Sequence, residues 1–156
     1  MLRVSAPTSF ELQPATEEDF EELLALRLAA MRESLEHLGR FDPERSRARF
    51  RASFSPMHTR HILFDAERVG FVAVKPQAHG LLLDHFYLHP RAQGHGLGAA
   101  VLRQICADAD RAGLSLSVGA LRGSAANRFY ERHGFVRVGQ TEFDIHYERA
   151  TRPGSD

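Results

Sequence analysis

The chain has a single cysteine, no tryptophan, no excess of charge of either sign and no long apolar run. Because Cys106 is the only cysteine among 156 residues, a disulfide within the chain is excluded. Twenty basic residues balance twenty acidic ones, so the net charge gives no reason to expect a nucleic-acid or membrane partner. No stretch is long enough to cross a bilayer, and residues 1–7 lack a signal-peptide pattern. We therefore expect a cytoplasmic protein.

The remaining composition is typical of a globular protein. Hydrophobic residues make up 43% and charged residues 26% of the chain. This length predicts a single domain over residues 1–156, with an ordered core over about 10–149 and short tails at both ends. Cys106 falls on the apolar side of a helical pattern, which favours a small buried side chain over a reactive thiol.

Hydrophobic periodicity predicts alternating strands and helices. The order is β-α-α-β-β-β-α-β-α-β-β, which predicts the α/β class in its α+β form: a mixed sheet of six to seven strands with helices on both faces. The expected strands cover residues 10–13, 61–64, 69–74, 81–89, 114–118, 135–138 and 142–147. The expected helices cover residues 16–38, 42–54, 97–113 and 124–133.

The glycine-rich segment 90–98 is the most informative feature. It lies between an apolar strand and a helical pattern, and its sequence is Pro-Arg-Ala-Gln-Gly-His-Gly-Leu-Gly. Glycines let backbone N–H groups approach phosphate oxygens, and a helix N-terminus adds a partial positive charge. The segment lacks the lysine and hydroxyl of a P-loop and the Gly-x-Gly-x-x-Gly spacing of a dinucleotide fold. It predicts another kind of phosphate site, with a tight turn that binds nothing as the alternative.

Two motifs resemble those of the GNAT N-acetyltransferases. Gln93-x-x-Gly96-x-Gly98 resembles the [Arg/Gln]-x-x-Gly-x-[Gly/Ala] signature that binds acetyl-coenzyme A (acetyl-CoA). Residues 129–135, Phe-Tyr-Glu-Arg-His-Gly-Phe, resemble the family's second motif at the family's spacing. The element order is also similar, so the resemblance covers residues 10–149 and implies a GNAT-like fold.

The resemblance implies an activity as well. It implies transfer of an acetyl group from acetyl-CoA to a primary amine of a small molecule or peptide, by direct attack through a tetrahedral intermediate. No metal is expected: His85 and His89 are four residues apart, which places them ~13 Å apart on a strand. The alternative function is a non-catalytic acyl-CoA-binding or regulatory module.

In the family, the cofactor lies against the glycine turn and the strand before it. The resemblance implies that this strand separates from its neighbour at a bulge, so that its free backbone binds the pantetheine arm and supplies an oxyanion donor. Ser124 stands where family members often carry an asparagine, and Asn127 follows one turn later. The residues expected to bind the cofactor are Phe86, Tyr87, Leu88, Gln93, Gly94, His95, Gly96, Leu97, Gly98, Ser124 and Asn127.

Tyr130 occupies the family's tyrosine position and is the expected acid. A phenol with an ordinary pKa of ~10 can protonate a thiolate whose conjugate acid has a pKa near ~8.5. Two candidates for the base stay open. Asp84 precedes Phe86 by two residues, so strand alternation places both on one face and His85 on the other. His146 lies in the last strand, which borders the acceptor cleft in the family.

Acceptor recognition is expected from residues 36–42 and from the closing hairpin at 139–144. The acids and aromatics there would suit a small amine or a peptide N-terminus, or would be ordinary solvated turns. Homodimers are frequent in the family, so a homodimer is an open expectation, although the sequence fixes no interface.

Overall fold

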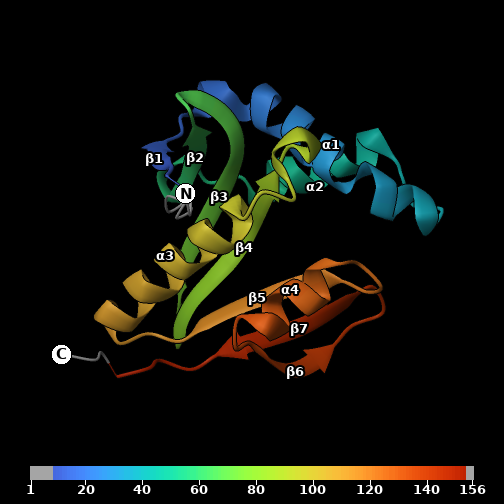
Figure 1. The fold of residues 1–156 in the computed structure, drawn as a ribbon. Coiled ribbons are helices and arrows are strands. Elements are labelled where there is room, and N and C mark those ends of the chain that lie inside the picture. The colour runs from blue at the N-terminus through green and yellow to red at the C-terminus, as the bar shows by residue number, and fades with distance from the viewer. Residues whose placement is uncertain (1–8, 154–156) are drawn as a thin grey trace, which may run out of the picture.

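The computed structural model describes residues 9–153, which form a seven-stranded mixed sheet with helices on both faces (Figure 1). Of the tails expected before residue 10 and after residue 149, residues 1–8 and 154–156 lie outside the described residues. The predicted fold class and element order are confirmed. The strands are β1 (Glu11–Pro14), β2 (Thr59–Phe64), β3 (Glu67–Gln77), β4 (Gly80–Leu88), β5 (Leu116–Leu121), β6 (Val136–Gln140) and β7 (Asp144–Arg149). The helices are α1 (Phe20–His37), α2 (Pro43–Ser53), α3 (Leu97–Ala112) and α4 (Ala126–Arg132), with short 3-10 turns at Glu17–Asp19, Pro56–His58 and Pro90–Ala92.

Among the strands that extend beyond their predicted ends, β3 and β5 do so by the most residues. β5 continues from Val118 to Leu121 because Gly119, Ala120 and Leu121 pair with β7. β3 continues through Pro76 and Gln77, where the sequence predicts a turn, because both residues pair with the start of β4. The partner that extends β5 lies far along the chain, outside the local pattern, whereas β3 is extended by the strand that follows it directly in a hairpin.

Each face of the sheet has its own core. Helices α3 and α4 pack on one face around fully buried side chains such as Leu102 and Leu116. Helices α1 and α2 pack on the other face around Leu23 and Phe50. Cys106 is buried as predicted, and burial raises the pKa of its thiol. Within residues 9–153, no helix is both long and apolar enough to span a membrane.

The sheet splits in the middle. Within residues 9–153, β4 and β5 are the only parallel neighbours, and they pair only through Leu81–Leu83 of β4. Beyond Leu83, β4 continues beside β3 while β5 follows β7, so the two strands diverge (Figure 1). Next to the split, Val74 pairs with Leu83 and Ala73 with His85, which makes Asp84 the extra residue of a β-bulge. The structure therefore places a bulge on the strand where the family resemblance implied one.

Candidate active site

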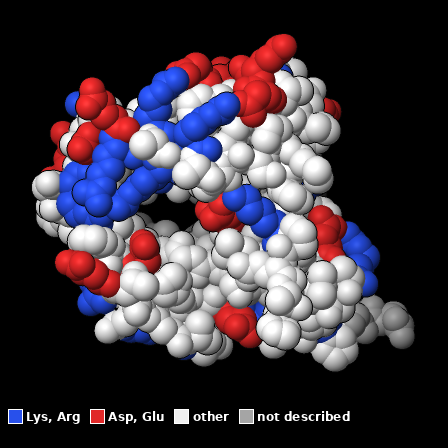
Figure 2. Space-filling view, turned by 180° about the vertical axis from the view of Figure 1, so that it is seen from behind, with Lys and Arg blue, Asp and Glu red and all other residues white. Residues whose placement is uncertain are grey.

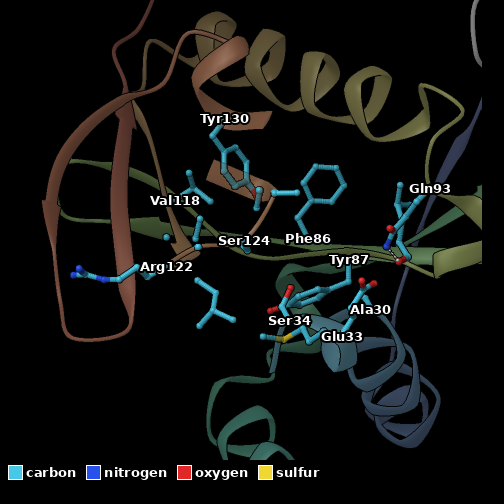
Figure 3. A pocket seen from close by; sticks show the side chains of 18 of the residues that line it. Ala30, Glu33, Ser34, Phe86, Tyr87, Gln93, Val118, Arg122, Ser124 and Tyr130 are labelled. Carbon is cyan, nitrogen blue, oxygen red and sulfur yellow. Dashed lines mark hydrogen bonds between the residues drawn. The ribbon is translucent and has the colours of Figure 1, made fainter. Parts of the chain in front are cut away.

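Two cavities meet at the split. The first, called here the Tyr130 cavity, has a volume of about 680 Å³ and lies between α1, the free part of β4 and the turn after β5 (Figure 3). The second, called here the His146 cavity, has a volume of about 1050 Å³ and is lined by α1, the start of α2, β4, β5 and β7. Asp84, Tyr87 and Gly119 line both cavities, so one passage leads through the sheet. The opening is visible from behind the molecule (Figure 2).

The glycine turn presents free backbone donors. Gly94 and Gly96 have φ angles of 80° and 82°, in the left-handed region that favours glycine. In the described part of the chain, no backbone N–H from Gly94 to Ala99 donates to a protein acceptor. The Gln93 side chain donates to the carbonyl of Leu88 at 3.0 Å and so anchors the turn to the end of β4. The result is a set of unpaired N–H groups at the N-terminus of α3, suited to an anion.

Tyr130 projects from α4 into the Tyr130 cavity. Its ring is 5% exposed and packs edge-on against Phe129 and Phe135, with centroids 5.4 Å away in each case. Figure 3 shows the ring beside Val118, near Phe86. No protein group within residues 9–153 forms a hydrogen bond with its hydroxyl. Burial raises the pKa of Tyr130, so the phenol stays protonated at neutral pH.

The other expected cofactor contacts differ in their placement. Ser124 lines the Tyr130 cavity, whereas Asn127 does not. The Asn127 amide donates to the carbonyls of Leu121 and Ser124 at 2.9 and 3.0 Å, and its oxygen accepts from the Tyr147 hydroxyl at 2.8 Å. Asn127 thus holds the turn between β5 and α4, and its expected contact with the cofactor stays a prediction.

Strand alternation gave the wrong face for Asp84. Phe86 packs against Phe129 on the α4 side, but the Asp84 carboxylate accepts from Lys75 Nζ at 2.6 Å on the α2 side. Asp84 Oδ2 also lies 3.4 Å from Nε2 of His85. The extra residue of the bulge breaks the two-residue period, so Asp84 shares its side with His85. Lys75 is a site residue that the sequence analysis missed, because no motif marks it.

His85 is the most buried polar group next to the site. It is 6% exposed, its Nε2 lies 3.0 Å from Ser53 Oγ, and its Nδ1 has no partner within residues 9–153. Its ring meets that of Phe50 edge-on, with centroids 5.1 Å apart. Burial lowers the pKa of His85, so the imidazole is neutral near pH 7.

His146 lies against Gly119 where the two cavities meet. The two residues are partners across β5 and β7, and a Cβ added to Gly119 would lie 3.5 Å from His146 Nδ1. Because this distance is an ordinary van der Waals contact, the imidazole packs closely over Gly119 without depending on the missing side chain. No hydrogen bond to another described residue occupies its ring nitrogens. Its ring nitrogens are therefore available to a molecule in the cavity.

The sequence matches the model of a known protein family over residues 58–137, just over half of the chain, and that family is the GNAT acetyltransferase domain. The chain belongs to the GNAT acetyltransferase family. A search of curated proteins by sequence gives no significant match.

Solved structures show the same fold. The PaiA N-acetyltransferase of Thermoplasma acidophilum, solved with coenzyme A, is 18% identical with a TM-score of 0.74, over 91% of this chain and 99% of that one. An acetyltransferase of Thermus thermophilus is 21% identical with a TM-score of 0.71, over 92% and 98%. The ribosomal-protein-S18-alanine N-acetyltransferase of Escherichia coli is 15% identical with a TM-score of 0.68, over 95% and 98%.

The site of this GNAT acetyltransferase fits the acyl donor of the family, acetyl-CoA. The free N–H groups after Gln93 suit a diphosphate, and the unpaired edge of β4 suits an extended ligand arm. Phe86, Tyr87, Leu88, Gln93, Ser124 and Tyr130, all predicted site residues, line the Tyr130 cavity. Within residues 9–153, no three His, Cys, Asp or Glu side chains are grouped so that they could hold a metal ion.

Proposed function

We propose that this GNAT acetyltransferase transfers the acetyl group of acetyl-CoA directly to a primary amine of a small molecule or peptide. The observation that carries the proposal is the placement of Tyr130. Its unpaired hydroxyl lies in the cavity between the diverging strands β4 and β5, and Gln93, next to the glycine turn, lines the same cavity.

The donor side holds and activates the thioester. Acetyl-CoA supplies an acyl group on a thiol leaving group. The N–H groups from Gly94 to Ala99 bind its diphosphate, and the free backbone of β4 beyond Leu83 pairs with its arm. As the C–S bond breaks, Tyr130 donates its phenolic proton to the departing sulfur.

The acceptor side prepares the amine. Because Lys75 holds the Asp84 carboxylate, we assign Asp84 the positioning of the amine, through a hydrogen bond that it accepts from the nitrogen. His146 takes the proton that the nitrogen loses as the N–C bond forms. Imidazole suits this step because a ring nitrogen can accept a proton and the ring has no hydrogen-bond partner among the described residues.

Replacing Tyr130 with phenylalanine tests the proposal. The assay follows the release of free coenzyme A thiol with a panel of amines. Loss of a general acid lowers kcat by roughly 100-fold or more, while KM for acetyl-CoA stays close to the wild-type value because the ring still fills its place. The control is Tyr147→Phe, whose hydroxyl binds Asn127 outside the cavity; this variant melts at a lower temperature but keeps kcat.

Two results would contradict the proposal. If Tyr130→Phe retains full kcat at every pH, Tyr130 is not the acid. If the wild-type protein binds coenzyme A but acetylates no amine of a broad panel, the protein is a non-catalytic acyl-CoA-binding module.

A further inference from the structure

Helix α2 carries arginines on two sides, and the two sides differ in their partners. Arg47 forms an ion pair with Glu21 of α1, and Arg51 pairs with Glu17. Arg45 and Arg49, four residues apart on the same helix, line the His146 cavity instead. Neither forms an ion pair or a side-chain hydrogen bond with any described residue. Their charges therefore remain available to a molecule in that cavity.

Two more arginines line the same cavity from other elements. Arg27 of α1 lies with its guanidinium 5.7 Å from the ring of Tyr87, and its buried Nε has no acceptor within residues 9–153. Arg40, in the turn between α1 and α2, lies 3.4 Å from the ring centroid of Phe143 in the closing hairpin. Aromatic contacts orient both groups without neutralising them. Seen from behind, the basic side chains gather along one side of the opening, where α1 and α2 lie (Figure 2).

Acidic groups in the cavity do not balance these four arginines. Asp42 caps α2 by accepting from the backbone N–H of Arg45, and Asp84 is paired with Lys75. Among the lining residues, the carboxylates of Asp42 and Asp144 have no ion pair in the described chain, so two acidic charges face four arginines. The chain as a whole is neutral, so the local excess of guanidinium groups comes from the fold rather than from composition.

We propose that the acceptor amine also carries an anionic group, a carboxylate or a phosphate, and that Arg45 and Arg49 bind it with Arg27 and Arg40. This inference rests on the proposed acetyl transfer to an amine. The amine lies at Asp84 and His146, and the anion lies toward α2, so the cavity selects a molecule with both groups. Guanidinium groups suit this task because they bind carboxylates and phosphates through paired hydrogen bonds. Residues 39–42 and 143–144, from segments where acceptor recognition was expected, line the cavity together with Arg27, Arg45 and Arg49.

The test compares amines that differ only in the anion. Two pairs of amines show which anion is bound. Phenylalanine is compared with phenethylamine to test a carboxylate, and phosphoethanolamine with ethanolamine to test a phosphate. We expect kcat/KM to be at least tenfold higher for the anionic member of one pair. The double variant Arg45→Gln/Arg49→Gln lowers kcat/KM for that amine by roughly 10- to 100-fold, mainly through KM, and leaves its neutral partner unchanged. The control is Arg47→Gln/Arg51→Gln, which removes two arginines of the same helix that face away from the cavity.

A binding measurement separates this inference from the proposed function. Calorimetric titration of the coenzyme A-bound protein with the preferred anionic amine, or with both anionic amines if neither is acetylated, does not require turnover. Binding that the Arg45→Gln/Arg49→Gln variant loses and the control variant retains supports the inference, even if no amine is acetylated and the proposed function fails. Equal use of neutral and anionic amines, or equal affinity of both double variants for the anionic amine, overturns it while acetyl transfer still stands.

Discussion

Replacing His85 with glutamine tests how burial beside the bulge makes the stability of this protein depend on pH. The imidazole is 6% exposed, and burial outweighs the attraction of the Asp84 carboxylate 3.4 Å away, while Arg27 and Lys75 add repulsion. The result is a pKa lowered from 6.5 to about 4. The unfolded chain therefore binds a proton on this residue at a higher pH than the folded chain does.

The sign and size of the effect follow from these two values. The stabilisation from His85 is complete above about pH 6.5 and falls as the pH drops toward about 4, because acid favours the protonated, unfolded chain. The full difference between the pKa values of the unfolded and folded chains corresponds to about 3 kcal/mol in the free energy of unfolding. About 2 kcal/mol of this is lost between pH 7 and pH 5.

Glutamine removes the titration and can replace Nε2 in the hydrogen bond with Ser53. The free energy of unfolding is measured in urea by circular dichroism at pH 7 and pH 5. From pH 7 to pH 5, the free energy of unfolding of the wild-type protein falls by about 2 kcal/mol more than that of His85→Gln. His79→Gln serves as the control, because it makes the same substitution at an exposed histidine. Parallel losses in wild type and His85→Gln would refute the argument that burial keeps His85 neutral.

Two further predictions concern the turn and the base. Gly96→Ala places a Cβ at a φ of 82°, which lowers the free energy of unfolding by about 1–2 kcal/mol and raises KM for acetyl-CoA. The control is Gly113→Ala, at a φ of 71° beyond the other end of α3, which lowers the stability by the same amount without changing KM. Equal KM values in the two variants would refute a role of the turn in binding. His146→Gln removes the proton acceptor and lowers kcat by roughly 100-fold or more, whereas Asp84→Asn removes a group that positions the amine and acts mainly on KM for the amine. An unchanged kcat in His146→Gln would exclude His146 as the base.

Features that depend on short stretches of sequence could be predicted from the sequence. The turn at Gly94–Gly96, the helix after it and the position of Tyr130 follow from local motifs, and the structure places the turn and Tyr130 at the same split in the sheet. The face of Asp84 could not be predicted, because a bulge is defined by the pairing of two strands and strand alternation assumes that none occurs. Three arginines of the His146 cavity, Arg27, Arg45 and Arg49, were missed for a related reason. Arg45 and Arg47 are two residues apart in the sequence, and only the packing of α2 shows which of them faces the cavity.

The bulge at Asp84 explains why one strand serves both sides of the site. Without the extra residue, Asp84 and Phe86 would share a face, and the carboxylate would lie in the apolar contact with Phe129, where its charge would be costly to bury. With it, the apolar side chain of Phe86 stays on the donor side, while Asp84 and His85 lie on the acceptor side next to Lys75. The bulge also lies where pairing between β4 and β5 ends, so the residue that breaks the alternation marks the start of the passage between the two cavities. The extra residue thus gives the donor side an apolar surface and the acceptor side a charged one, at the point where β4 and β5 diverge and the two cavities meet.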